Sequence, residues 1–116
     1  MTNTTSFDFG YGEVPAKKHP KGGGWVADSA WVADSAWVCD SARVCGNAKV
    51  YGGAMVSGGA WVYGNARVCG DARVSGDARV YGNAVISGDA WVSGNAWVCG
   101  NAWVSGNAWV ASGIHT

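Results

Sequence analysis

A six-residue period runs through most of the chain and decides what it can fold into. From Val26 to Val110 an aliphatic residue recurs at every sixth position without an insertion. Alanine fills a second fixed position of the same period, from Ala30 to Ala108. Between these two positions stand Asp-Ser three times and then mostly Gly-Asn, Gly-Asp or Gly-Gly. A register this regular is not a product of chance, so the period indicates a structural repeat.

Each six-residue unit has the pattern of a short strand followed by a corner. Successive side chains of a strand point to opposite faces, so each valine points one way and its two neighbours point the other. Gly-Asn and Gly-Asp are turn dipeptides because glycine and asparagine accept positive φ at little cost. Strands this short cannot form hairpins, and identical corners always turn the same way. We therefore expect a chain that coils, with valine inside, alanine near the corners and parallel coils about 4.8 Å apart.

The composition agrees with a chain that lacks helices. Leucine and glutamine are absent from the 116 residues, and Glu13 is the only glutamate, so the usual helix formers are missing. The formal net charge is zero, which argues against a general nucleic-acid binder. No apolar run approaches the ~18 residues of a membrane span. Residues 1–12 also lack the basic stretch and apolar core of a secretory signal. We expect no nucleic-acid partner and no membrane span.

The repeat resembles that of the hexapeptide-repeat proteins, whose pattern is an aliphatic residue, a small residue, two turn residues, a small residue and a variable one. The unit VSGDAR at residues 74–79 fits this pattern position by position. The resemblance covers residues 25–113 and implies an all-β fold, a single-stranded left-handed parallel β-helix. This triangular β-solenoid would have about five coils of three hexapeptides. The repeat and its lead-in, residues 10–26, are also similar to uncharacterised bacterial and bacteriophage repeat proteins, a resemblance that implies no activity.

We divide the chain into a non-repeat segment at residues 1–24, the solenoid at residues 25–113, and a C-terminal tail at residues 114–116. In the first segment, aromatic residues alternate with other residues from Phe7 to Tyr11, as in a short strand. This segment is interpreted as a cap on the first coil of its own molecule, as an arm that adds a strand to a neighbour, or as disordered. The three glycines at 22–24 would supply a hinge for either a cap or an arm.

Three units per coil place residues eighteen apart on top of one another. On the first face, the position before valine alternates between tryptophan and arginine, which suits cation–π stacking. Most of the eight tryptophans fall near the two ends of the prism. Three roles stay open for them: stacking within one molecule, contacts between subunits, and stacking against a sugar. The residues predicted to form a self-assembly interface are Phe7, Phe9, Tyr11, Trp25, Trp31, Trp37, Trp91, Trp97, Trp103 and Trp109.

The repeat gives no support to catalysis. The resemblance implies two kinds of enzyme: acyltransferases, which use a histidine and loops that interrupt the coils, and zinc-dependent carbonic anhydrases, which use three histidines. The array here is uninterrupted, and both histidines, His19 and His115, lie outside it. Aspartate at the corners interchanges with asparagine, which indicates turn chemistry rather than calcium ligation. We expect no enzyme activity, no cofactor and no metal site.

The four cysteines occupy the outward position after valine. The two that share a face, Cys45 and Cys99, are three coils apart, about 14 Å by strand spacing. That distance is too long for an internal disulfide. We expect free surface thiols, which fit a reducing compartment, with disulfides between packed filaments as an alternative.

An interior of valine and alanine buries little apolar area for the number of residues that it orders. A whole number of coils would let the last coil of one subunit sit on the first coil of the next, where backbone groups are unpaired. The sequence thus predicts a structural subunit that stacks head to tail into a filament through its coil ends and Trp-rich outer faces. One alternative is a module of a phage tail or surface appendage that binds a glycan or protein through its tryptophans. Another is a catalytically inactive acyltransferase-like protein. Localisation stays open between a bacterial cytoplasm and a phage particle or extracellular filament.

Overall fold

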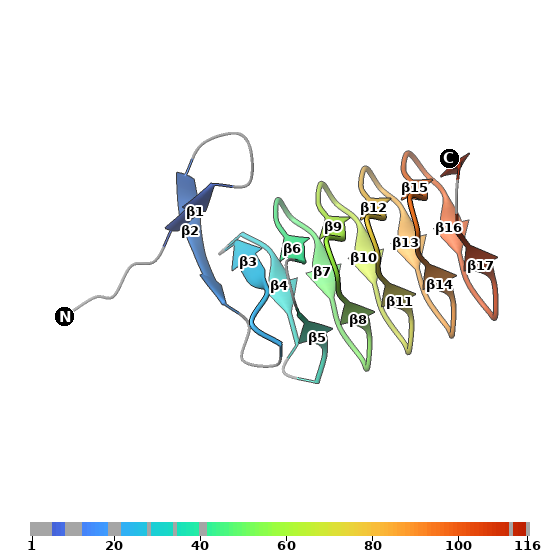
Figure 1. Ribbon diagram of the computed structural model, residues 1–116, viewed down its shortest axis with the longest axis horizontal. Helices are drawn as coiled ribbons and strands as arrows, with labels where there is room; N and C mark the ends of the chain where they lie inside the picture. The colour runs from blue at the N-terminus through green and yellow to red at the C-terminus, as the bar shows by residue number, and fades with distance from the viewer. Residues whose placement is uncertain are drawn as a thin grey trace.

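A computed structural model of the chain describes residues 6–8, 13–18, 22–27, 29–33, 35–39, 42–111 and 113–115. From residue 25 onwards the chain winds into a solenoid of about five turns with three parallel sheets, which form the sides of a triangle (Figure 1). Each turn takes eighteen residues, so that Val74 pairs in parallel with Val56 on one side and Val92 on the other. The predicted all-β, triangular architecture is confirmed.

The first sheet has eight strands and extends beyond the repeat at both ends, in the order β1-β2-β3-β6-β9-β12-β15-β18. Its strands are β1 (Ser6–Asp8), β2 (Glu13–Lys18), β3 (Trp25–Ala27), β6 (Arg43–Val44), β9 (Trp61–Val62), β12 (Arg79–Val80), β15 (Trp97–Val98) and β18 (Ile114–His115).

The second and third sheets have five strands each and lie within the repeat. The second sheet contains β4 (Trp31–Val32), β7 (Lys49–Val50), β10 (Arg67–Val68), β13 (Val85–Ile86) and β16 (Trp103–Val104). The third sheet contains β5 (Trp37–Val38), β8 (Met55–Val56), β11 (Arg73–Val74), β14 (Trp91–Val92) and β17 (Trp109–Val110).

The core consists of the two fixed positions of the period. Between Ala36 and Val98 every repeat valine, every repeat alanine and Ile86 is 0% exposed. The β-branched side chains suit the strands, where their restricted χ1 costs little. Alanine fills the narrower space next to each corner, as the sequence predicts.

Glycine at the corners meets two constraints at once. Gly64 has a φ of +69°, and a Cβ added there would lie 2.9 Å from the backbone nitrogen of Gly82 in the next coil. A side chain would therefore be strained in its own backbone and would collide with a neighbouring one. In the units whose corner begins with glycine, the first corner position needs glycine for both reasons, whereas the second position accepts asparagine or aspartate.

Backbone hydrogen bonds give the stack of coils a direction. The N–H groups of the residues before and after each valine donate to the next coil, as Trp61 does to the C=O of Ala78 at 3.0 Å and Tyr63 to that of Val80 at 2.9 Å. The second corner residue does the same, and Asn65 donates to the C=O of Gly82 at 2.8 Å. From Asn47 to Asp89, three N–H groups of each hexapeptide thus point toward the C-terminal end of the solenoid, whereas at two earlier corners the hydroxyls of Ser29 and Ser35 donate to the next coil in place of the third.

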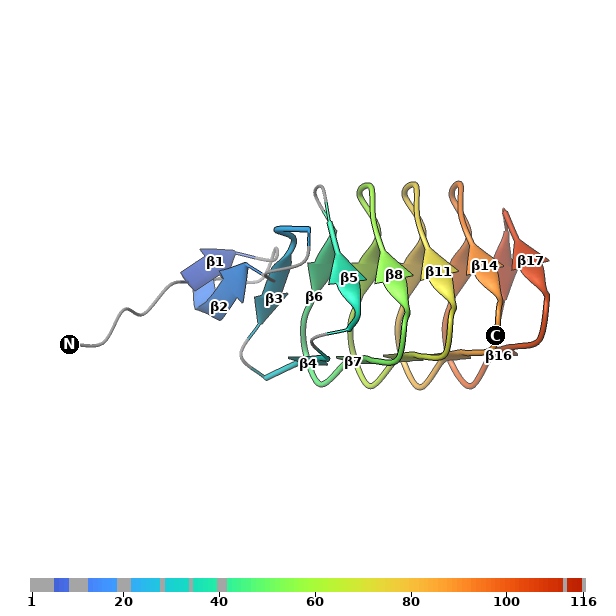
Figure 2. The same ribbon diagram turned by 90° about the horizontal axis from the view of Figure 1, so that it is seen from below.

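Two segments outside the repeat extend the first sheet. Strands β1 and β2 form an antiparallel hairpin, and β2 pairs antiparallel with β3, with Lys17 opposite Val26 (Figure 2). At the other end β18 pairs in parallel with β15, so that the first residues of the predicted tail continue the sheet. Of Phe7 the structure describes the backbone, in β1, whereas Phe9 and Tyr11 lie outside the described residues.

Candidate interaction surfaces

The outward column before valine on the first sheet is a ladder of tryptophan and arginine. The Arg43 guanidinium carbon lies 5.1 Å from the ring centroid of Trp61. That of Arg79 lies 5.5 Å from the same ring and 5.1 Å from the ring of Trp97. These distances are within the range of cation–π attraction. The predicted stacking on this face is confirmed, and it acts within one molecule.

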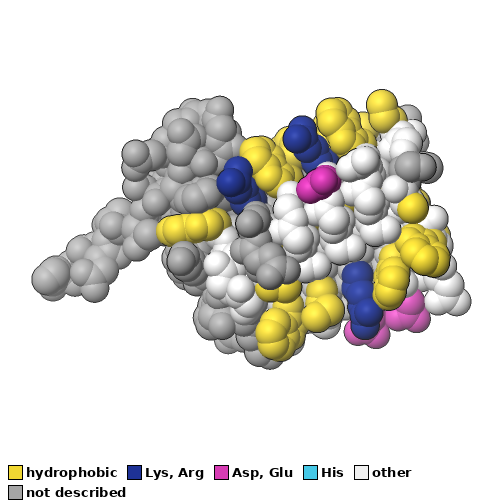
Figure 3. All heavy atoms as spheres, in the orientation of Figure 1, with side chains coloured by type: hydrophobic (Ala, Val, Ile, Leu, Met, Phe, Trp, Pro, Cys, Tyr) yellow, Lys and Arg dark blue, Asp and Glu magenta, His cyan; other side chains and the backbone are white. Residues whose placement is uncertain are grey.

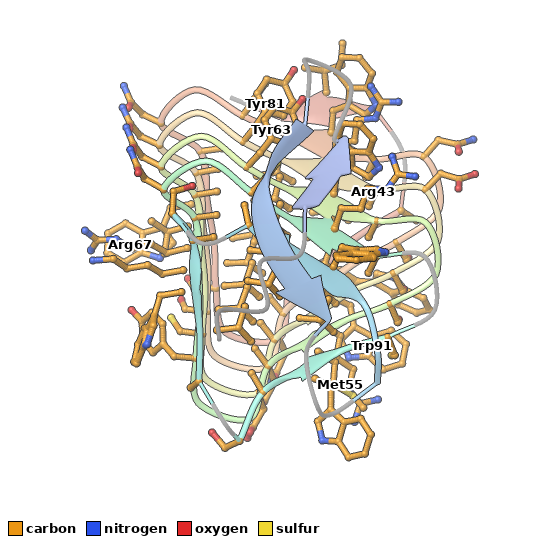
Figure 4. The ribbon with its side chains drawn as sticks, turned by 90° about the vertical axis from the view of Figure 1, so that its left-hand side faces the viewer. Arg43, Met55, Tyr63, Arg67, Tyr81 and Trp91 are labelled. Carbon is orange, nitrogen blue, oxygen red and sulfur yellow. The ribbon has the colours of Figure 1, made fainter. Side chains whose placement is uncertain are left out.

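The neighbouring column, after valine on the same sheet, combines tyrosine with cysteine. The rings of Tyr63 and Tyr81 stack with centroids 4.9 Å apart and planes 4° apart, and Figure 4 shows them one behind the other. Cys45 and Cys99 flank this stack and are 3% and 8% exposed, whereas the other two cysteines are half-buried. All four are free thiols. The prediction of surface thiols is wrong for Cys45 and Cys99, which are buried. Trp25 and Tyr63 pack against the cluster that contains Cys45, and Cys99 is hydrogen-bonded to Tyr81.

Hydrogen bonds between tyrosine and cysteine change the tyrosine acidity. The bond between Tyr81 and Cys99, helped by burial, raises the pKa of Tyr81 to about 12. A bond to Cys69 raises the pKa of Tyr51 in the same way, and burial raises the pKa of Tyr63. The three phenols therefore stay neutral at physiological pH.

Shallow grooves run beside the outward column of the third sheet. Arg73 lies with its guanidinium carbon 5.2 Å from the ring of Trp91, and a groove of about 350 Å³ separates this pair from the nearby corner. Its lining residues are Gly53, Asp71, Arg73, Asp89 and Trp91. A second groove, of about 240 Å³, lies between Trp91 and Trp109 and also reaches Asp89. Carboxylates, a guanidinium and indole rings thus border one stretch of the surface.

The C-terminal end of the solenoid carries the two most exposed tryptophans of the described chain. Trp103 in β16 is 73% exposed and Trp109 in β17 is 68% exposed. Their indole N–H groups donate to the hydroxyls of Ser87 and Ser93 in the coil before, at 3.3 Å and 3.1 Å. The two rings are therefore held in fixed orientations while most of their surface meets solvent.

Strand edges are open at the same end. Strands β16 and β17 are the last of their sheets. In earlier coils the N–H groups at the positions of Trp103 and Ser105, and of Trp109 and Ala111, donate to a following coil. No following coil covers these two sheets among the described residues. Charged side chains usually protect such edges, but no Asp, Glu, Lys or Arg follows Asp89 in the sequence.

The N-terminal end is closed on two of its three sides. Strand β2 covers the edge of β3. Beside β5, the Gly24 N–H donates to the C=O of Val38 at 2.7 Å, and Gly23 bridges to Cys39. Within the described residues, β4 is the one repeat strand at this end that no other segment covers. The N-terminal end therefore leaves one repeat strand uncovered, whereas the C-terminal end leaves the edges of β16 and β17 uncovered, within the described residues.

The tryptophans predicted for self-assembly are spread over all three sheets of the solenoid. Figure 3 shows apolar side chains in separate patches with basic side chains between them on the face that it views. The tryptophans of the first coil, Trp25, Trp31 and Trp37, lie on three different sheets, as do those of the last coil, Trp97, Trp103 and Trp109. Trp91 lies in the coil before, with its ring centroid 5.5 Å from that of Trp109. The sequence pattern did not single out Ser87 and Ser93, whose hydroxyls accept the indole hydrogen bonds of Trp103 and Trp109. The one available signal is that serine recurs at the position after the aliphatic residue.

Other kinds of site find no support in the described residues. In that part of the chain, no three His, Cys, Asp or Glu side chains gather in a group that could hold a metal ion. No helix in it is long and apolar enough to cross a membrane.

A repeat of six residues, a turn of eighteen and three parallel sheets around a valine and alanine core define a parallel β-solenoid repeat protein. The family model of the YdcK β-solenoid repeat matches at residues 42–58, 48–64, 66–78, 72–88, 78–94 and 86–100, which together make up half of the chain. The chain belongs to this family. A search of the curated proteins and a search of the solved structures each found no match.

Proposed function

We propose that this protein is a structural, non-enzymatic solenoid subunit that associates with copies of itself end to end. The observation that carries the proposal is the C-terminal end, where two uncharged strand edges lie open beside the exposed rings of Trp103 and Trp109. Unprotected edges of this kind pair readily with another chain. Exposed aromatic side chains are also enriched where proteins meet.

The direction of the backbone hydrogen bonds favours head-to-tail joining. The C-terminal end presents mainly N–H groups, because three of them per hexapeptide point that way from Asn47 to Asp89. The N-terminal end presents the complementary C=O groups, such as those of Ala30 and Val32 at the open strand β4. Joining like ends would bring N–H groups against N–H groups. A filament built head to tail pairs donors with acceptors at every junction.

The strength of such a junction depends on how many sides it uses. A backbone hydrogen bond contributes about 1 kcal/mol net, and burial of an indole contributes roughly 2 kcal/mol. On the first sheet β18 already lies against β15, so a junction that pairs β4 with β16 requires β18 to yield that place to β3 of the neighbour. With β4 as the one open N-terminal side, such a junction gains about three bonds and the indole of Trp103, on the order of 5 kcal/mol. Association itself costs about 4–15 kcal/mol. The chain with both N-terminal sides closed is therefore expected to assemble weakly and at high concentration.

The proposal includes membership of the hexapeptide-repeat superfamily for this family of solenoids. Its support is the order of aliphatic, small, turn, turn, small and variable residues, together with the triangular turn of eighteen residues. The uninterrupted array offers no loop that would bind a coenzyme, in keeping with a structural role.

Sedimentation velocity over a wide range of concentration tests self-association. The wild-type chain is expected to form larger species as its concentration rises. The double variant Trp103→Lys/Trp109→Lys should stay monomeric, because two charges then protect the open edges. Trp91→Lys is the matched control, since this tryptophan is one coil earlier in the column of Trp109 and 40% exposed. Wild type that stays monomeric at every concentration, or an end variant that assembles like wild type, contradicts the proposal.

Glycan binding is a second candidate, and the grooves beside Trp91 favour it. Indole faces stack on sugar rings, and the carboxylates of Asp71 and Asp89 would accept hydrogen bonds from hydroxyl groups. A glycan array probed with dilute monomer tests this candidate. Specific binding that Trp91→Ala abolishes supports it, and an array without any specific signal rejects it.

A further inference from the structure

We infer that a groove beside the outward column of the second sheet binds an acidic glycan, whose chain lies along the axis of the solenoid. The groove has a volume of about 470 Å³, and its lining residues are Asn47, Lys49, Asn65, Arg67, Asn83 and Val85. It lies on a different sheet from the grooves beside Trp91 and uses neither end of the solenoid. This site is therefore independent of the self-association proposed above.

Two cations of neighbouring coils face this groove together. Lys49 in β7 lies directly opposite Arg67 in β10, and both side chains are exposed. Like charges at directly opposed positions repel each other. On the first sheet, by contrast, Arg79 lies between Trp61 and Trp97, within cation–π distance of both rings. An anion bound between Lys49 and Arg67 would offset a repulsion that the first sheet avoids by alternating arginine with tryptophan.

Both cationic groups are available to a ligand. No carboxylate lines the groove among the described residues. Within the same part of the chain, neither the Lys49 ammonium nor the Arg67 guanidinium has an ion pair or a cation–π contact. Figure 4 shows the Arg67 side chain extending away from the coils. Such groups form charge-assisted hydrogen bonds with carboxylate and sulfate, so the ligand is expected to carry acid groups.

Asparagine amides form a ladder along one side of the groove. Asn47 Nδ2 donates to Asn65 Oδ1 at 3.5 Å, and Asn65 Nδ2 donates to Asn83 Oδ1 at 3.4 Å. An amide has two N–H donors and an oxygen with two lone pairs, so each of these side chains keeps a donor and an acceptor outside the ladder. Hydroxyl groups also both donate and accept. A ladder of amides beside two cations therefore suits a ligand with hydroxyls as well as acid groups, as an acidic glycan has.

The spacing of the coils fits consecutive sugar residues. The groove runs along the axis, because its lining residues repeat from one coil to the next in the parallel register of β7, β10 and β13. Coils about 4.8 Å apart place Lys49 and Arg67 one sugar residue apart along an extended glycan. The groove then accommodates about three sugars, with acid groups on two consecutive ones. Val85 offers an apolar contact to the C–H face of the sugar beyond Arg67.

A nucleic acid fits this groove less well. The lining has two cations and no aromatic side chain, and the formal net charge of the chain is zero. Proteins that bind single strands combine a longer basic track with aromatic rings on which the bases stack. We therefore commit to a glycan, and an oligonucleotide serves as a competing probe in the test.

Isothermal titration calorimetry on the dilute, full-length chain tests the site with defined probes. An oligogalacturonate carries a carboxylate on every sugar, and a heparin-derived oligosaccharide carries sulfate groups as well, so the two distinguish the kind of acid. The methyl-esterified oligogalacturonate keeps the hydroxyls and loses the charge. An oligoglutamate and an oligothymidylate of matched charge carry anions without a chain of sugar rings rich in hydroxyls. Binding is expected for at least one acidic glycan, at least about tenfold tighter than for the other three probes, and it should weaken as salt is added.

Substitutions of the exposed cations locate the site. Lys49→Ala/Arg67→Ala should weaken glycan binding by at least about tenfold. Arg73→Ala is the matched control, because this arginine has the same position in the next hexapeptide but lies on the third sheet, and it should leave binding unchanged. Asn65→Ala, in the middle of the ladder, should weaken binding of the acidic glycan and leave any weak binding of oligoglutamate unchanged.

Several results would overturn the assignment of this site. They are the absence of binding by both acidic glycans, equal or tighter binding of the oligopeptide or oligonucleotide, and a double variant that binds like wild type. A loss that Arg73→Ala shares would place the ligand elsewhere and overturn it as well. Sedimentation of the Lys49→Ala/Arg67→Ala variant measures self-association separately and should match wild type, since neither residue lies at an end of the solenoid.

Discussion

Two adjacent glycines of one corner offer a test of why the repeat requires glycine. Gly58 has a φ of +64°, and a Cβ there would lie 3.0 Å from the backbone nitrogen and oxygen of Gly76. Gly59 lacks a positive φ, and its Cβ would meet the Asp77 Oδ1 at 3.0 Å, the end of an exposed and rotatable side chain. The same substitution to alanine therefore meets backbone at one position and a movable carboxylate at the next.

The two substitutions should differ clearly in their cost. For Gly58→Ala we expect a loss of about 1–2 kcal/mol from the left-handed backbone and roughly 1–3 kcal/mol from overpacking. For Gly59→Ala a gain of about 0.4–1 kcal/mol from the less flexible unfolded chain offsets the displacement of the carboxylate. The second variant should therefore stay within about 0.5 kcal/mol of wild type.

Urea unfolding followed by tryptophan fluorescence measures both variants in the same way. The midpoint of Gly58→Ala should fall clearly, and that of Gly59→Ala should stay close to wild type, at unchanged slope. Equal losses for the two variants would refute the explanation of the corners by positive φ and close backbone approach.

Three further predictions concern the outer faces. Tyr81 should ionise near pH 12 by ultraviolet absorbance, and Cys99→Ala should lower that pKa. Because its folded pKa lies above the ordinary value of 10.0, its stabilising contribution is complete below pH 10 and is lost as the pH rises toward 12, a loss that unfolding at alkaline pH should show. Iodoacetamide should alkylate Cys45 and Cys99 more slowly than the two half-buried thiols by mass spectrometry, and equal rates would contradict their burial. Trp61→Leu should cost about 1–2 kcal/mol in urea unfolding through its two arginine contacts, and an unchanged midpoint would contradict their role.

Most of the solenoid can be predicted from the sequence because every unit repeats the same local choice. Valine at one position and alanine at another predict which side chains are buried, and the eighteen-residue spacing predicts the alternation of Arg43, Trp61 and Arg79. Local propensity and the global fold agree at each of these positions, so the repeat pattern alone is sufficient to predict the coils and their buried residues.

The features that escape prediction depend on neighbours outside the period. Cys45 has the position of an outward residue, but the aromatic side chains around it bury it. Residues 1–24 have no repeat to indicate where β2 would pair. Ile114 lies opposite Trp97 after seventeen residues instead of eighteen, so a count in sixes places this strand in a tail. Each case depends on contacts that a repeat pattern does not encode.

Self-association through the open C-terminal end is the central claim, and hydrogen exchange tests it most directly. The amides of Trp103, Ser105, Trp109 and Ala111 should exchange freely in dilute solution, because no coil follows them in the described chain. In concentrated, assembled protein they should become protected, as the equivalent amides of earlier coils are. Assembled protein in which these amides still exchange as fast as in the monomer would contradict the claim.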